Sequence, residues 1–211
     1  GEVRAGARHT CALSLEGAPY CWGENARGQL GRAVEDPDPH SPAPVEDPVF
    51  GVSFVSLDLG DQFTCGISDE DDGRQVYCWG YGAQGRLGRS INGDSDPMPF
   101  PVSFMGDPSP ALRLSLGRAH GCAIVDEGMG YCWGSNSHGQ LGSEQVELFE
   151  ISEEARAVTG LADERVDIAA GADHTCVRLD KGDPRIENDE LRCWGSREYG
   201  QLAEGVVGAV G

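Results

Sequence analysis

Histidine is the side chain best suited to proton transfer near neutral pH, and three of the five histidines in this 211-residue chain occupy one recurring position. His9, His120 and His174 each lie three residues after a glycine, in the segments GARHTC, GRAHGC and GADHTC. A fourth copy, GDQFTC, holds Phe63 at that position. Because an essential acid or base would not be repeated and then replaced by phenylalanine, we interpret these histidines as packed rings with a hydrogen-bonded nitrogen. The chain also lacks the GxSxG, Walker and HExxH motifs, so we predict that it is not an enzyme.

The eight cysteines lie two to each copy of the pattern. The two cysteines of a copy enclose 9, 12, 9 and 16 residues, whereas the opening glycine always precedes the first cysteine by five residues. A β-hairpin produces this spacing, because its paired strands keep their register while its tip grows into solvent. Opposite residues of antiparallel strands lie close to disulfide geometry. We therefore predict four disulfides, namely Cys11–Cys21, Cys65–Cys78, Cys122–Cys132 and Cys176–Cys193.

Free buried thiols and a metal site are the alternatives for these cysteines. No CxxC knuckle occurs, and two thiolates per site are too few for structural zinc. Disulfides persist in oxidising compartments, so we expect an extracellular, cell-surface or periplasmic location.

Acidic residues dominate the charge: 16 Lys and Arg stand against 35 Asp and Glu, for a formal net charge of −19 and a pI near 4.4. Nucleic-acid binding depends on clustered cations, so we do not expect a nucleic-acid partner. No apolar run reaches the length of a membrane span, and we expect no membrane insertion. Two acidic clusters, Asp69–Glu70–Asp71–Asp72 and Asp94 with Asp96, offer oxygen ligands for Ca²⁺. Their spacing matches no EF-hand, so we interpret them as solvated loops, with calcium as the alternative, and expect no cofactor.

The whole pattern recurs four times, with opening glycines separated by 54, 57 and 54 residues. Each copy has a second segment, such as CWGENARGQLG from Cys21, and three copies are preceded by a strand-like run such as ALRLSLG. With 31 Gly and 12 Pro the chain is rich in turns, which favours an all-β fold. Repeats with three or four short strands each are typical of β-propeller blades. We expect one array with repeats at approximately 1–48, 49–105, 106–160 and 161–211, and consider a short helix only at 145–158, which lacks Gly and Pro.

The combined pattern G-x-x-H-T-C-A-L followed by C-W-G-x-N-x-x-G-Q-L-G resembles the regulator-of-chromosome-condensation repeat over essentially the whole chain. The version with paired cysteines resembles secreted bacterial repeats. The resemblance implies a β-propeller of four-stranded blades, usually closed as a seven-bladed ring. Four repeats therefore imply a partial ring, an open arc or a unit that assembles with copies of itself. Relatives of this kind include a nucleotide-exchange factor bound to chromatin and an inhibitor of β-lactamases, but the acidic charge and the predicted disulfides disfavour chromatin and a cytosolic GTPase.

Positions that change from repeat to repeat are free to contact a partner. The residue before the loop glycine varies most: Arg27, Gln84, His138 and Tyr199 occupy it, with Glu198 beside the last. Arg and Tyr are common anchors of protein interfaces. We therefore predict a non-enzymatic protein-binding module whose rim loops contact a partner. A self-assembling surface or fibre component and an inhibitor of a secreted enzyme are the alternatives.

Overall fold

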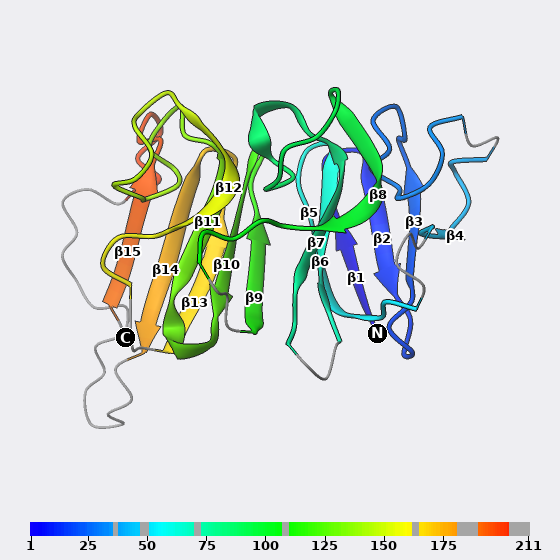
Figure 1. Cartoon of the computed structure of the whole chain (residues 1–211), viewed down its shortest axis with the longest axis horizontal. Helices are drawn as coiled ribbons and strands as arrows, with labels where there is room; N and C mark the ends of the chain where they lie inside the picture. The colour runs from blue at the N-terminus through cyan, green and yellow to red at the C-terminus, as the bar shows by residue number, and fades with distance from the viewer. Residues whose placement is uncertain are drawn as a thin grey trace.

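Four antiparallel β-sheets stand side by side in the computed structural model, which describes residues 1–35, 38–46, 51–69, 73–106, 110–161, 165–180 and 190–202 (Figure 1). Each sheet lies within one of the four predicted repeats, and we call the sheets blades 1 to 4. The all-β propeller class predicted from the sequence is confirmed. Within the described ranges, no helix has the length and apolarity needed to cross a bilayer.

The strands of each blade follow one another in sequence order. Blade 1 contains β1 (Glu2–Ala5), β2 (His9–Leu13), β3 (Pro19–Gly23) and β4 (Ala43–Pro44). Blade 2 contains β5 (Phe54–Leu59), β6 (Phe63–Ser68), β7 (Val76–Tyr81) and β8 (Ser95–Pro101). Blade 3 contains β9 (Ala111–Leu116), β10 (His120–Val125), β11 (Gly130–Ser135) and β12 (Ile151–Ala157). Blade 4 contains β13 (Arg165–Ala170), β14 (His174–Asp180) and β15 (Glu190–Gly195) among the described residues, and two 3-10 turns, η1 (Ala83–Gly85) and η2 (Asp126–Gly128), lie in blades 2 and 3.

Each blade is stapled across its central hairpin. The two cysteines of a blade are directly opposed in the antiparallel register, with Cα atoms 4.1 Å apart. The structure joins them in the four pairs expected from the sequence, and no free cysteine is found in the described part of the chain. The staple therefore holds the pairing of the second and third strands whatever the length of the hairpin tip.

The hydrophobic core lies between blades, in three clusters, one at each junction. Phe54, Leu57 and Trp79 of blade 2 pack against the Cys11–Cys21 disulfide of blade 1, for example. The disulfides of blades 1 to 3 are completely buried by the following blade. Cys176 and Cys193 of blade 4 are only partly buried. The face of a blade that carries the disulfide is thus completely buried only when the next blade packs against it.

The opening glycine of each repeat allows the aromatic ring three residues later to fold back over the backbone. A Cβ atom at Gly60 would lie 2.0 Å from Phe63 Cε1, and one at Gly171 would lie 2.0 Å from His174 Cε1. No real Cβ contact is that short, so glycine is required there by space. This contact explains the constant spacing of glycine and His or Phe in the four segments.

Side chains on the first strands of the blades form hydrogen bonds to the neighbouring blade. Asp58 in β5 accepts a hydrogen bond from the backbone N–H of Leu116 in β9 (2.7 Å), and Ser115 in β9 accepts one from Ala170 in β13 (2.9 Å). Burial raises the pKa of Asp58, while the hydrogen bond from Leu116 lowers it. The ends of the first strands of all four blades, with the opening glycines that follow them, line one hollow, as expected for blades arranged around a common axis.

No helix forms at residues 145–158. The segment begins with turns and continues as β12, which pairs with β11. Within β12, Ser152 and Ala155 are buried, whereas Ile151, Glu153 and Ala157 are exposed. Pairing in the sheet therefore overrides the helix-compatible composition.

Candidate binding rim

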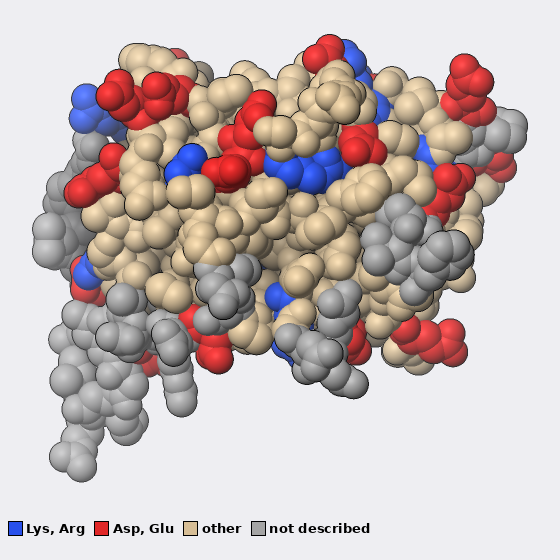
Figure 2. Space-filling view, viewed as in Figure 1, with Lys and Arg blue, Asp and Glu red and all other residues tan. Residues whose placement is uncertain are grey.

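The loops that follow the third strand of each blade lie together at one end of the molecule, at the top of Figure 1. The hairpin tips between the second and third strands lie at the opposite end, because those strands are antiparallel. We call the end formed by the loops after β3, β7, β11 and β15 the upper rim. Figure 2 shows acidic side chains gathered along this upper edge, above a middle region with few charges. The upper rim therefore carries many of the acidic side chains that are visible from this side.

A recurring glutamine holds the rim loop in place. The side-chain oxygens of Gln29, Gln140 and Gln201 accept a hydrogen bond from the backbone N–H two residues earlier, at 2.9, 2.8 and 2.7 Å. The residues held in this way are Arg27, His138 and Tyr199. Because the contact uses the backbone, it fixes the loop without restricting which side chain is displayed.

A buried asparagine closes the same loop in blades 1 and 3. Asn136, 3% exposed, accepts the N–H of Leu141 (3.1 Å) and donates its amide to the carbonyls of Val146 and Glu147 (3.0 and 2.9 Å). Asn25 makes the corresponding bonds to Leu30 and Ala33 in blade 1. The recurring glutamine and asparagine side chains therefore hold the backbone of these rim loops in a defined conformation.

The predicted rim residues differ in how freely they face solvent. Tyr199 is 85% exposed, and His138 and Glu198 are also exposed. Arg27 is half-buried, because its guanidinium lies 4.4 Å from the ring centre of Tyr81 in the next blade. The structure brings all five predicted residues to the same end of the molecule, but it gives Arg27 an additional role between blades.

Blade 2 builds its rim loop differently. Arg86 replaces the recurring glutamine and donates to Gln84 Oε1 (2.8 Å) and to the carbonyl of Ala83 (2.8 Å). Arg86 also lies 4.5 Å from the ring centre of Tyr81, so this ring contacts two guanidinium groups. Burial lowers the pKa of Arg86. Gln84 adopts φ 64°, a left-handed conformation that is uncommon outside glycine.

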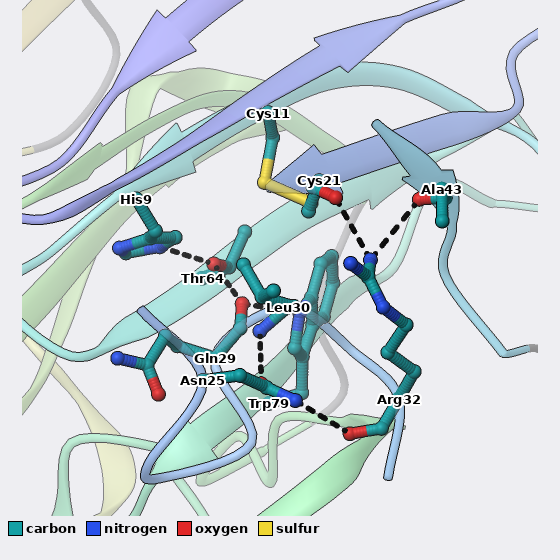
Figure 3. The surroundings of a disulfide bond; sticks show 10 residues. All are labelled: His9, Cys11, Cys21, Asn25, Gln29, Leu30, Arg32, Ala43, Thr64 and Trp79. Atoms are coloured by element: carbon teal, nitrogen blue, oxygen red, sulfur yellow. Dashed lines mark hydrogen bonds between the residues drawn. A yellow bond between two sulfur atoms is a disulfide. The ribbon is translucent and has the colours of Figure 1, made fainter. Parts of the chain in front are cut away.

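A buried relay of hydrogen bonds connects the rim to the junction of blades 1 and 2 (Figure 3). Thr64 of blade 2 donates its hydroxyl hydrogen to the carbonyl of Gln29 (2.9 Å), and Trp79 donates its indole N–H to the same carbonyl (3.1 Å). Since the hydroxyl hydrogen is used, the 2.8 Å contact with His9 requires that Nε2 of His9 donates to Thr64. The neutral ring then has no hydrogen on Nδ1.

The junction of blades 3 and 4 repeats the relay. His120 contacts Thr175 (3.0 Å), and both Thr175 and Trp194 donate to the carbonyl of Gln140 (2.9 Å each). The Nδ1 atoms of His9 and His120 are buried and find no partner among the described residues. Protonation would place an N–H there without an acceptor, and burial lowers the pKa of both histidines to about 4.

At the junction of blades 2 and 3, other residues stand in place of both the histidine and the threonine. Phe63 takes the position of histidine and Gly121 that of threonine, while Trp133 still donates to the backbone carbonyl of Arg86 (3.0 Å). The interpretation of the histidines as packed structural rings thus agrees with the structure at His9 and His120. Sequence reasoning missed their threonine partners, which lie one repeat later in the chain. The signal was present, because histidine precedes a repeat with threonine and phenylalanine precedes one with glycine.

The acidic clusters considered for calcium are only partly covered. Glu70, Asp71 and Asp72 lie outside the described residues. Asp96 is engaged as an acceptor for Arg89 (3.2 Å). Among the residues that the structure describes, no three His, Cys, Asp or Glu side chains are grouped so that they could hold a metal ion.

Comparison with known proteins agrees with this architecture. Profiles of the Regulator of chromosome condensation (RCC1) repeat match residues 16–67, 73–124 and 127–178, and a second profile of the same repeat matches 2–29, 113–140 and 166–201. The chain belongs to the RCC1 repeat family. Its curated relatives include the ultraviolet-B receptor UVR8 of Arabidopsis thaliana, 33% identical over 206 residues, and the mitochondrial RCC1 domain-containing protein RUG3 of the same plant, 32% identical over 206 residues. Those alignments cover 96% and 95% of this chain but 43% of each relative, so the chain spans less than half of their length.

Solved structures of RCC1 proteins share the fold. Human WBSCR16 superposes with a TM-score of 0.78 at 21% identity, covering 99% of this chain and 51% of that chain. Prp20p from Saccharomyces cerevisiae, whose structure was described together with its binding to Gsp1p and histones, gives a TM-score of 0.73 at 26% identity over 95% of this chain and 45% of that chain. The RCC1 fold is thus a scaffold for protein interaction in a neighbour of known structure.

Proposed function

We propose that this chain is a non-enzymatic protein-binding module that contacts its partner through the upper rim and works in an oxidising compartment. One observation carries the proposal: recurring glutamines hold the backbone of the rim loops, while the side chains displayed by the held residues differ between blades. A rigid scaffold with varied loops is the common design of recognition surfaces. The binding partners in the printed description of Prp20p support a protein as the ligand class.

The oxidising compartment rests on the four paired cysteines. Such staples persist where glutathione and thioredoxin do not reduce them. Non-reducing peptide mapping of the protein from its native cell fraction tests this part. Four intra-blade disulfides support it, and eight alkylatable thiols contradict it.

The rim is tested by capturing proteins from the culture fluid or periplasm of the source cells with the immobilised chain. The rim variant His138→Ala/Tyr199→Ala removes two exposed rim side chains. The matched control Leu15→Ala/Glu16→Ala removes two exposed side chains at a hairpin tip on the opposite end. A partner captured by the parent and the control, but lost by the rim variant, supports the proposal. Equal capture by all three proteins contradicts it.

Self-association is a second candidate, favoured by the two outer blade faces. Thr10 and Trp22 of blade 1 occupy the positions of Thr64 and Trp79, and both are only partly buried. On blade 4, His174 occupies the position of His9 and is also partly buried. A second copy could therefore complete the same junction that recurs inside the chain. Light scattering at micromolar concentration tests this, since a monodisperse monomer rules it out.

A further inference from the structure

Blade 3 displays an apolar projection on the upper rim that the other described rim loops lack. Leu148, Phe149 and Ile151 are 54%, 77% and 51% exposed within four consecutive residues. The loop of blade 2, GRSINGDS from Gly88, exposes no large apolar side chain, and the described part of the blade 1 loop exposes only Val34, at 47%. Large apolar side chains gathered on a surface mark interaction sites.

The backbone at the centre of this projection is held in an unfavourable conformation. Phe149 has φ 72°, and it and Gln84 are the two non-glycine residues with positive φ in the described chain. A bulky residue rarely adopts that region, and such outliers persist where the surroundings enforce them, often at functional sites. Both outliers lie on the upper rim.

Buried contacts enforce that conformation. The N–H of Phe149 donates to the carbonyl of Asn136 (3.0 Å), and the N–H of Asn136 donates to the carbonyl of Glu150 (2.9 Å). The Asn136 amide also holds the carbonyls of Val146 and Glu147. The loop is therefore fixed from both sides while the phenyl ring extends into solvent, so ordering it on binding costs little entropy.

Acidic side chains surround the projection. Glu144, Glu147 and Glu150 are exposed, and within the described residues none of the three carboxylates pairs with a Lys or Arg. Glu144 also lines an open hollow beside the projection, together with Val146 and Leu148. The local charge has the same sign as the net charge of −19, so an anionic partner is repelled and a cationic one is attracted.

We propose that the segment 144–151 of blade 3, the acidic-apolar loop, binds a cationic segment of a partner protein that also carries apolar side chains. Phe149 is the anchor that packs against the partner's apolar side chains, and the three glutamates pair with its lysines or arginines. This inference deepens the proposed function and rests on it, because it names the chemistry that the rim recognises.

Isothermal titration calorimetry with a short synthetic peptide that alternates lysine and leucine tests the proposal. Two further peptides test the two requirements separately. One has glutamate in place of lysine and tests the need for positive charge. The other has serine in place of leucine and tests the need for apolar side chains. We expect the lysine-leucine peptide to bind at least tenfold more tightly than either. Added salt should weaken its binding, since exposed charges are screened beyond about 10 Å at 0.1 M.

Two variants localise the binding. Leu148→Ser/Phe149→Ser removes the apolar anchor, and Glu144→Gln/Glu147→Gln removes two charges while keeping the side-chain shapes. We expect each to weaken binding at least tenfold. The control Leu15→Ser/Glu16→Gln makes the same kinds of change at a hairpin tip, and we expect it to bind like the parent.

Absence of binding, equal binding of the glutamate-leucine peptide, or equal losses in the control variant would overturn the proposal. Self-association that disappears in Leu148→Ser/Phe149→Ser would also overturn it, because the occupant would then be a second copy. Capture of a rim partner that depends on His138 and Tyr199 but not on Phe149 would leave the proposed function standing while this inference fails.

Discussion

Acidification should weaken the junctions that contain His9 and His120. Both histidines have a pKa near 4 in the folded protein, against about 6.5 in the unfolded chain. A depressed histidine pKa means that the folded state favours the neutral ring. The stability from this preference is complete above pH 6.5 and is lost as the pH falls from 6.5 toward 4.

The expected size follows from proton linkage. Between pH 7 and pH 5, each histidine should lower the free energy of unfolding by about 2 kcal/mol, so the two together account for about 4 kcal/mol. Lowering the pH also reduces repulsion among the many carboxylates, which stabilises the folded state. A comparison of variants is needed to separate these opposing effects.

Urea unfolding at pH 7 and pH 5 is the assay. The double variant His9→Gln/His120→Gln removes both titrating rings, and His138→Gln removes an exposed histidine as a control. The decisive quantity is the change in unfolding free energy between the two pH values, so a lower stability of a variant at pH 7 does not affect the test. Between pH 7 and pH 5, we expect the free energy of unfolding of the parent and of the control to fall by about 4 kcal/mol more than that of the double variant. Equal changes in all three proteins would refute the argument from the unpartnered Nδ1 atoms.

Three other changes test the packing. Limited dithiothreitol followed by alkylation and mass spectrometry should open Cys176–Cys193 first, because its two residues are the cysteines left partly exposed, and a different order would contradict this. Gly60→Ala should lower the thermal unfolding midpoint clearly, since its Cβ would lie 2.0 Å from Phe63, and an unchanged midpoint would show that the ring can move away. Trp79→Phe should lower the free energy of unfolding in urea by about 0.5–1.5 kcal/mol, because the carbonyl of Gln29 loses one of its two donors, and a cost within error would show that the indole donor is dispensable.

The sequence predicted those features that depend on local order and counting. The hairpins followed from the constant spacing around the cysteines, and the opposed register of Cys65 and Cys78 followed from the hairpin. The position of Tyr199 on a rim loop followed from the fixed distance to the loop glycine. Each of these rests on residues fewer than about twenty positions apart, where strand pairing and turn chemistry act directly.

Contacts between blades were beyond this reasoning. His9 meets Thr64 at a separation of 55 residues, and Arg27 stacks on Tyr81 across the same junction. The strand β12 was also obscured, because the composition of its segment is compatible with a helix and only the neighbouring strand β11 decides otherwise. Tertiary pairing decides such cases, and a single repeat does not contain it.

The variation among the repeats carries that missing information when neighbours are compared in order. Histidine in one repeat accompanies threonine in the next, at His9 and Thr64 and again at His120 and Thr175, whereas phenylalanine accompanies glycine. The two positions therefore change as a pair across a junction, while the tryptophan that donates to the same carbonyl does not change. By the same rule, a surface that packs on blade 4 should place a threonine, or another side chain that both donates and accepts, opposite His174. A covering blade with glycine there would leave the Nε2 hydrogen of His174 unpaired, so the identity of that one residue distinguishes a matching partner face from a mismatched one.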